Sequence, residues 1–177
     1  MIPIITKKEQ TIPFFRYVLQ LKSVKRAGWV SKVHISNPES VADHTFSMCA
    51  MSMVLSDMLG LDTEKVMKMA ILHDLAESIT GDYMPGEISK QHKLSQEKKA
   101  MNSILRCMPS EIRSKYRKIW QEYTLNKTCA ARFVHKADKI DMLLQAKEYA
   151  KQGYSRKLLS YFSNSAEKSL HMNTHDL

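Results

Sequence analysis

The segment ILHDLAESITGD carries four titratable side chains close together: His73, Asp74, Glu77 and Asp82. The apolar residues before His73 predict a buried helix, in which unpaired carboxylates would be costly. Glu77 follows His73 by four residues and Asp74 by three, so in a helix these side chains share one face. No Lys or Arg lies within one turn, the nearest in sequence being Lys68 and Lys90. A cation from outside the chain would balance the charge, which predicts a metal site.

Two further candidate ligands lie elsewhere, His44 in ESVADHTF and Asp138 in FVHKADKIDML. Imidazole and carboxylate ligands with open positions for water suit divalent transition metals. Taken singly, neither residue indicates a ligand, and Asp138 could equally pair with Lys139 or cap a neighbouring helix. A His-Asp dipeptide is also weak by itself, since His175-Asp176 forms a second one in the tail.

In combination, the order His44, His73-Asp74, Asp138 resembles the H…HD…D motif of the HD-domain metal-dependent phosphohydrolases. The segments RAGW, PESVADH, LHDLAESITGD and QAKEY resemble the 5′-deoxynucleotidase branch of that family over residues 21–150. PESVADH together with HDxAExxxGD is specific. The resemblance implies an all-α fold, a single HD-domain helical bundle.

The resemblance also assigns roles. The metal ligands would be His44, His73, Asp74 and Asp138. Glu77 would position or deprotonate the attacking water, and Asp82 would close the same site. Arg26 would hold the phosphate with its planar fork, and Trp29 would hold the sugar and exclude a 2′-hydroxyl by shape. A hydrogen bond from Arg26 could instead accommodate that hydroxyl.

The spacing of RAGW differs from that of the bacterial deoxynucleotidases, in which the Arg and the Trp are adjacent. Ala27 and Gly28 separate them here, so we expect a differently shaped pocket.

The predicted function is a metal-dependent phosphomonoesterase that hydrolyses (2′-deoxy)nucleoside 5′-monophosphates to nucleoside and phosphate. The expected cofactor is a divalent transition metal such as Mn²⁺ or Co²⁺. One alternative is a phosphodiesterase or alarmone-type nucleotide hydrolase that uses the same metal site. Another is a non-catalytic nucleotide-binding module, against which the intact set of ligands argues.

Two residues beside Asp138 have open roles. His135 lies one turn earlier on the same face, where the family pattern has no His. Three interpretations of His135 are open: a partly exposed polar residue, an extra metal ligand, or a proton donor to the leaving alkoxide. Asp141 could be a carboxylate that orients a metal ligand.

Apolar residues recur at helical spacing throughout, and no stretch alternates with period two. We therefore expect one domain over residues 1–177, with about six to seven helices and core motifs within residues 26–141. The expected helices are 11–23, 39–59, 63–79, 94–107, 110–123, 128–151 and about 155–169, followed by a frayed tail. Residues 26–38 and 80–92 are expected as loops, because they contain Gly, Pro and polar residues.

The net charge of +9 favours anionic partners without choosing among them. The basic run RSKYRK is interpreted as a solvated helix face, and nucleic-acid binding is not expected because no recognition motif accompanies it. No apolar run reaches the roughly 18 residues of a membrane span, so the protein is expected to be cytoplasmic. The family resemblance and an apolar stripe, Tyr116, Ile119, Trp120 and Tyr123, predict a core face or a homodimer face. The Met residues of 48–69 are interpreted as core.

Overall fold

The computed structural model describes residues 4–171, with side chains from 11 to 168. This part of the chain contains nine α-helices and one short 3₁₀ helix, and no strand. The helices are α1 (Ile4–Gln20), η1 (Leu21–Ser23), α2 (Ala27–Val33), α3 (Val41–Met58), α4 (Thr63–Leu72), α5 (Glu77–Thr80), α6 (Lys90–Arg106), α7 (Ser110–Leu125), α8 (Cys129–Lys151) and α9 (Arg156–His171). The all-α prediction is confirmed. The predicted tail begins within α9, and its residues 172–177 lie outside the described part.

The helix count exceeds the expected six to seven for two reasons. A short helix, α2, forms in the segment expected as a loop. It is held by burial of Trp29 and Val33 against α8 and α9 rather than by local signals, because Arg26 at its start makes no side-chain cap. The helix expected over 63–79 is also broken: α4 ends at Leu72 and α5 begins at Glu77, with a turn between them.

Helix α3 begins at Val41, two residues after the expected start at 39. Ser40 caps it by accepting from the Asp43 backbone N–H, and the Asp43 side chain accepts from the Ser40 backbone in return. Such a capping box satisfies two backbone donors that would otherwise be unpaired. In α4, Asp62 accepts from the Lys65 backbone N–H in the same way. These caps fix the two helices that carry the histidines of the predicted site.

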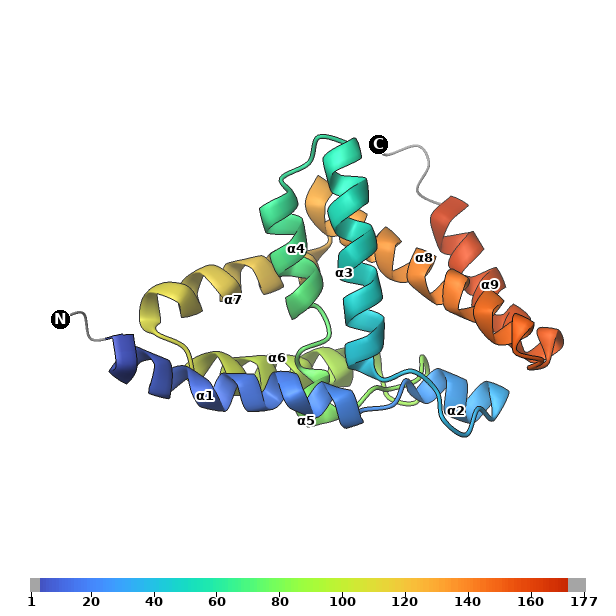
Figure 1. Cartoon of the computed structure of the whole chain (residues 1–177), viewed down its shortest axis with the longest axis horizontal. Helices are drawn as coiled ribbons and strands as arrows, with labels where there is room; N and C mark the ends of the chain where they lie inside the picture. The colour runs from blue at the N-terminus through green and yellow to red at the C-terminus, as the bar shows by residue number, and fades with distance from the viewer. Residues whose placement is uncertain (1–3, 172–177) are drawn as a thin grey trace.

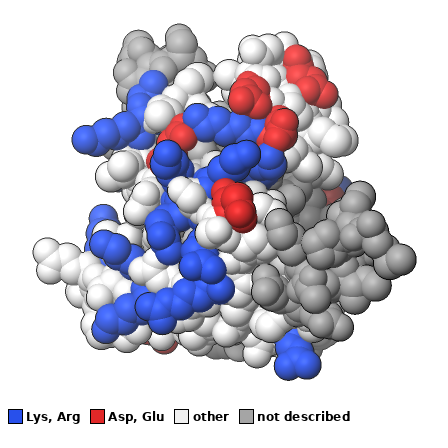
Figure 2. All heavy atoms as spheres, turned by 90° about the vertical axis from the view of Figure 1, so that its left-hand side faces the viewer, with Lys and Arg blue, Asp and Glu red and all other residues white. Residues whose placement is uncertain are grey.

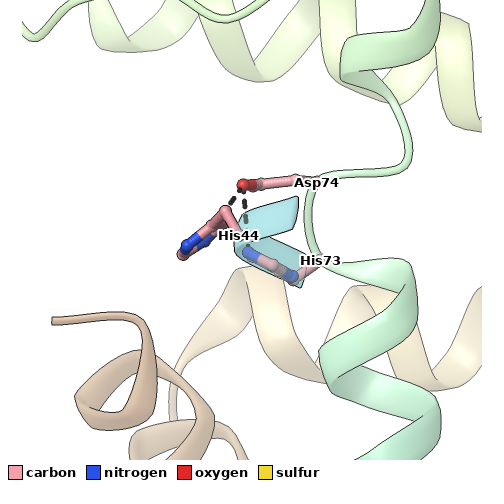
Figure 3. Close-up of side chains that lie close together, drawn as sticks. All are labelled: His44, His73 and Asp74. Carbon is pink, nitrogen blue, oxygen red and sulfur yellow. Dashed lines mark ion pairs between the residues drawn. The ribbon is translucent and has the colours of Figure 1, made fainter. Parts of the chain in front are cut away.

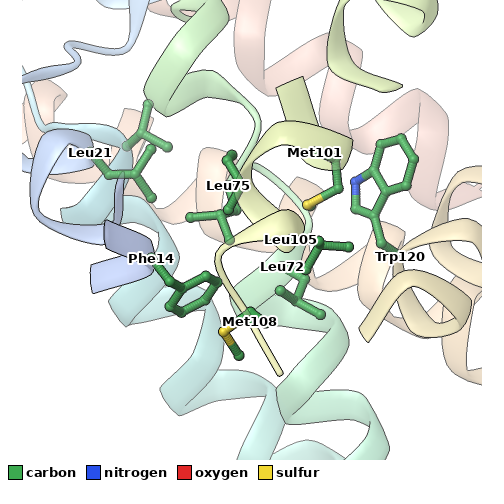
Figure 4. Packing of buried hydrophobic residues seen from close by; sticks show 10 residues of the cluster. Phe14, Leu21, Leu72, Leu75, Met101, Leu105, Met108 and Trp120 are labelled. Atoms are coloured by element: carbon green, nitrogen blue, oxygen red, sulfur yellow. The ribbon is translucent and has the colours of Figure 1, made fainter. Parts of the chain in front are cut away.

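Three clusters of buried apolar side chains hold the helices together. The first lies between α1, α4, α6 and α7 and includes Met101 and Trp120 (Figure 4). The second packs α3 and α4 against α8 around Met69. The third joins α2, α8 and α9 around Trp29 and Phe162. In Figure 1, α3 and α4 stand side by side and α9 runs along α8.

The apolar stripe of α7 is a core face. Trp120 is buried in the first cluster, and Tyr116 and Ile119 pack against the clusters. The Met residues divide differently from the prediction: Met48 and Met69 are fully buried, whereas others on α3, including Met53 and Met58, are exposed. A homodimer face would therefore lie elsewhere than on the stripe of α7.

Lys and Arg side chains gather on the face that includes α7 (Figure 2). Within RSKYRK, Lys115 and Lys118 are exposed, whereas the Arg113 guanidinium donates to the backbone carbonyls of Arg106 and Met108 at the end of α6. This arrangement fits the predicted solvated face. Among the described helices, none has the length and hydropathy needed to span a membrane.

Candidate active site

Two buried imidazoles form the base of the site, His44 near the start of α3 and His73 just after α4 (Figure 3). The Nδ1 atom of His44 lies 2.6 Å from Asp141 Oδ2, and that of His73 lies 2.6 Å from the carbonyl oxygen of Ala70. Since these acceptors take the proton of Nδ1, the Nε2 atom of each ring is the one that faces the site. Both Nε2 atoms are buried without a hydrogen bond.

Two carboxylates complete the predicted ligand set. Asp74 Oδ2 lies 3.0 Å from His73 Nε2 and 3.8 Å from His44 Nε2. Together these three residues form a group whose ligand atoms all lie within 4.8 Å of one another. Asp138 Oδ1 lies beside this group, 3.4 Å from His44 Nε2. Three of the four predicted ligands therefore form one compact group, and Asp138 borders it through His44.

The donor set fits a divalent metal. Two buried ring nitrogens that make no hydrogen bond are costly unless something else binds them, and both lie next to carboxylates that a cation could share. Burial alone would raise the pKa of Asp74, but the neighbouring His73 and Arg26 outweigh burial and hold that pKa well below its usual value. The carboxylate is therefore ionised and ready to bind a cation. Imidazole nitrogen and carboxylate oxygen suit transition ions better than Ca²⁺.

Arg26 bridges the two carboxylates from the residue before α2. Its Nη1 lies 3.3 Å from Asp74 Oδ2 and its Nη2 lies 3.9 Å from Asp138 Oδ1. Burial would lower the pKa of this guanidinium, but Asp74, Asp82 and Asp138 raise it above its ordinary value. Arg26, which the family resemblance assigned to the phosphate, therefore also balances part of the charge of these carboxylates. It lies 48 positions before Asp74, so it is outside the one helical turn around His73 and Asp74 that contains no Lys or Arg.

Glu77 opens α5 and faces the same site. Its side chain is buried, and Oε2 has no hydrogen-bond partner. Burial raises the pKa of Glu77 well above its ordinary value, and the charges of Asp74 and Asp82 raise it further. Lys93 of α6 opposes this shift, with Nζ 3.7 Å from Glu77 Oε1. A carboxylate with a raised pKa and a free oxygen is suited to accept a proton.

Asp82 ties the loop after α5 to α2. Its Oδ2 accepts from the Ala27 backbone N–H at 2.8 Å. Burial raises the pKa of Asp82, while Arg26 and the Ala27 N–H oppose that rise. Asp82 therefore lines the cavity and fixes the residue that follows Arg26.

Trp29 is almost fully buried, with 2% of its surface exposed. Its Nε1–H donates to Glu39 Oε1 at 2.7 Å, and its ring packs against Tyr149 and Phe162. The predicted sugar-binding indole thus forms part of a wall and has little free surface of its own.

His135 stacks on Tyr123, with ring centroids 4.1 Å apart, and its Nε2 lies 3.1 Å from the Tyr123 carbonyl oxygen. Burial lowers the pKa of His135, which favours the neutral ring and does not suit a proton donor. Asp141 orients His44, as one of the sequence-based interpretations held, and Ser47 Oγ donates to its other oxygen.

A cavity of about 330 Å³ opens over these groups. Six of the eight predicted site residues line it, namely Arg26, Trp29, Asp74, Glu77, Asp82 and Asp138. The two histidines are not among the lining residues, and their rings lie beneath the carboxylate of Asp74 that does line the cavity. Residues that sequence analysis did not assign to the site also line the cavity: Lys93, Lys139, Tyr83, Met84, Met142, Tyr161 and Phe162. Lys139 pairs with Asp138 at 2.8 Å, the contact that the sequence offered as an alternative to metal binding.

The family model described as HD domain matches residues 18–176, and the chain therefore belongs to the HD-domain family. This match extends through α9, which the motifs left outside. The chain is similar to the 5′-deoxynucleotidase HDDC2 of Homo sapiens, at 39% identity over 78% of this chain and 67% of that protein. It is also similar to the 5′-deoxynucleotidase HDDC2 of Dictyostelium discoideum, at 38% identity over 90% of each chain. A solved structure from Pyrococcus horikoshii OT3 is 31% identical, with a TM-score of 0.73 over 89% of this chain and 88% of that one.

Proposed function

We propose that this protein is a metal-dependent phosphomonoesterase that hydrolyses 2′-deoxynucleoside 5′-monophosphates to nucleoside and phosphate. One observation carries the proposal. The Nε2 atoms of His44 and His73, which make no hydrogen bond, lie next to the Asp74 carboxylate. The Arg26 guanidinium lies beside that carboxylate. A cation site next to a buried Arg is suited to a phosphate group. The names of the relatives supply the nucleotide class.

The proposed metal ligands are His44, His73, Asp74 and Asp138. A divalent cation held there, such as Mn²⁺ or Co²⁺, supplies Lewis-acid polarisation of the phosphoryl group and activation of a water. The Nδ1 contacts with Asp141 and Ala70 orient the two imidazoles for this task.

The chain's own residues bind the substrate. In the protein without substrate, Arg26 lies between the carboxylates of Asp74 and Asp138. When substrate binds, its N–H donors can turn to the phosphate oxygens and neutralise the negative charge that develops on them during attack. Lys93 and Lys139 line the same cavity and add positive charge.

Glu77 acts as the general base for the attacking water. It accepts a proton from the water as the water oxygen bonds to phosphorus and the bond from phosphorus to the 5′-oxygen breaks. The 5′-oxygen takes a proton from solvent to complete the nucleoside, and Glu77 returns its proton to solvent. Asp82 holds Ala27, and so Arg26, in position. Trp29 shapes the wall on the sugar side, so we attribute the preference for deoxyribose to cavity shape.

Phosphate release from dAMP and AMP, with metal-stripped protein resupplied with Mn²⁺ or Co²⁺, tests the proposal. We expect metal-dependent release, faster from dAMP. Glu77→Ala should retain the metal and lose hydrolysis, and full activity of this variant would refute the assigned role. Release only from cyclic or pyrophosphorylated nucleotides would favour a phosphodiesterase or alarmone-type hydrolase, and binding of metal and nucleotide with no hydrolysis would favour a binding module.

We also propose that residues 1–177 act as one domain and assemble as a homodimer. The support for the homodimer is the exposed apolar surface of α3. Four of its side chains face solvent: Phe46, Met53, Val54 and Met58. Exposed apolar surfaces of this kind mark interaction sites. Light scattering coupled to gel filtration should give twice the chain mass, and Phe46→Asp should give the monomer mass.

We place the protein in the cytoplasm. Three Cys residues lie unpaired in the structure, one of them exposed, which suits a reducing compartment. Imaging of a fluorescent fusion checks this location.

A further inference from the structure

We propose that helix α9 supplies the surface that binds the nucleobase, with Tyr161 as the residue that contacts the base. This inference rests on the proposed function and extends it to the end of the substrate away from the phosphate. None of the motifs discussed above includes a residue of α9.

The cavity has two kinds of lining. Charged groups gather around Arg26, Asp74, Glu77 and Lys93, where the phosphate would bind. Asp82, Asp138 and Lys139 add to the charged lining. Another part of the lining, here called the apolar wall, is formed by side chains that carry no charge: Met84, Pro85, Met142, Tyr161 and Phe162. With the divalent cation of the proposed function bound among the carboxylates, this lining suits a ligand with one anionic end and one apolar, planar end, as a nucleoside monophosphate has.

Tyr161 is the most exposed of the aromatic residues that line the cavity, since Tyr83 and Tyr123 are half-buried. About 48% of it is exposed, whereas Phe162 and Trp29 are buried. Its ring packs edge-on against Phe162, with centroids 5.2 Å apart and planes at 82°. Lys32 Nζ of α2 lies 5.8 Å from its ring centroid. The neighbours thus hold the Tyr161 ring at the cavity wall while leaving part of it open to a ligand.

Gly28 lets α9 reach the cavity. A Cβ atom added at this position would lie 2.8 Å from Phe162 Cε1 and 3.2 Å from Met84 Sδ. Phe162 in turn packs on Trp29, with ring centroids 4.3 Å apart. The Gly between Arg26 and Trp29 therefore brings the aromatic wall of α9 next to the residue that holds the phosphate. This close approach gives the altered RAGW spacing a physical meaning.

The wall would hold a base by stacking and thioether contact rather than by reading its edge. The apolar wall carries no amide, carboxylate or ammonium group, and the Trp29 N–H is already used by Glu39. Every base has a π-face, so stacking tolerates all of them. We therefore expect dAMP, dGMP, dCMP and dTMP to bind with similar affinity.

Binding to the Mn²⁺-loaded Glu77→Ala protein tests the inference without turnover. Calorimetry would compare dAMP with 2-deoxyribose 5-phosphate, which has the same phosphate and sugar but no base. Tyr161→Ala should weaken dAMP binding about tenfold and leave the sugar phosphate unchanged. Tyr161→Phe keeps the ring and should bind dAMP as its parent does. Leu158→Ala, an exposed change on the same helix outside the cavity lining, is the matched control.

The two proposals fail in different ways. Equal affinity of the parent protein for dAMP and the sugar phosphate, or unchanged dAMP binding in Tyr161→Ala, would overturn the base-binding role even if the native protein releases phosphate. If dAMP binds more tightly than the sugar phosphate in a way that depends on Tyr161, but the native protein releases no phosphate, the base-binding role stands. The proposed phosphomonoesterase function is then refuted. Equal loss of both ligands in Tyr161→Ala would show a general structural effect and also overturn it.

Discussion

The His44 ring and the Asp141 carboxylate are joined by a 2.6 Å contact across 97 residues of sequence. Both groups are buried, and Ser47 occupies the second oxygen of Asp141. Burial and Arg26 lower the pKa of His44, but Asp138 and Asp141 outweigh them and raise it to about 9. The Asp141 contact thus fixes which nitrogen of His44 faces the site, and it makes that nitrogen a stronger base and a better metal ligand.

Replacing Asp141 by Asn should therefore weaken metal binding without removing any ligand. The amide would keep the size of the side chain but lose its charge, and we expect Mn²⁺ or Co²⁺ affinity to fall about 10- to 100-fold. A competition titration against a metal indicator measures the change. Asp62→Asn is the control, since Asn caps α4 as well as Asp does. Equal affinities in both variants would argue against the orienting role.

Removing the metal should lower thermal stability. The cation would bind two buried nitrogens that make no hydrogen bond and would reduce the repulsion between the carboxylates of Asp74 and Asp138. A ligand at one hundred times its dissociation constant stabilises a protein by about 2.7 kcal/mol, which corresponds to roughly 5–10 °C in a domain of this size. Differential scanning fluorimetry with and without chelator measures the shift.

The same measurement on His73→Ala provides the contrast. This variant lacks one proposed ligand, so its melting temperature should respond weakly to added Mn²⁺. A metal-induced shift equal to that of the native protein would exclude His73 from the ligand set.

The pH dependence should follow Glu77. Its pKa is raised by burial and by Asp74 and Asp82, and lowered by Arg26 and Lys93. Proton acceptance requires the ionised form, so kcat/KM should fall as pH decreases through the pKa of Glu77. Lys93→Met removes one of the two positive charges, so the pKa rises and the acidic limb of the profile moves to higher pH.

Lys98→Met is the matched control for this profile, because Lys98 lies on the same helix and is exposed. Its acidic limb should coincide with that of the native protein. A Lys93→Met profile that also coincides would mean that another group sets the limb.

The sequence predicted the long helices well because their signals are local. The start of α3 has a capping box, and α8 runs over Cys129–Lys151 against a prediction of 128–151. The break after Leu72 was missed because the apolar pattern continues through it. In the structure the Glu77 N–H bonds to the Asp74 carbonyl and the Ser78 N–H to that of Leu75, three residues back rather than four. This tighter winding coincides with the residues that meet the site, a tertiary cause that periodicity does not reveal.

The candidate site divides in the same way. His44, His73, Asp74 and Asp138 were found because their types and order match a motif, and the structure brings them together. Lys93 and Tyr161 carry no such signal: one is among 27 Lys and Arg residues, and the other lies on a helix outside the motifs. Only the packing of α6 and α9 against the cavity distinguishes them from similar side chains nearby.

Gly28→Ala tests the close approach of α2 and α9. Ala favours a helix over Gly by about 1 kcal/mol, but its Cβ would press on Phe162 and Met84. Overpacking of this kind costs about 1–3 kcal/mol, so we expect a net loss of unfolding free energy, measured by urea denaturation.

Gly28→Ala should also change ligand binding. Displacement of Phe162 should narrow the cavity along the apolar wall and weaken the binding of dAMP more than the binding of 2-deoxyribose 5-phosphate. Ser31→Ala, an exposed change on the same helix, should alter neither the unfolding free energy nor the affinity for dAMP. Unchanged dAMP affinity in Gly28→Ala, with the protein folded, would mean that the base does not contact this wall.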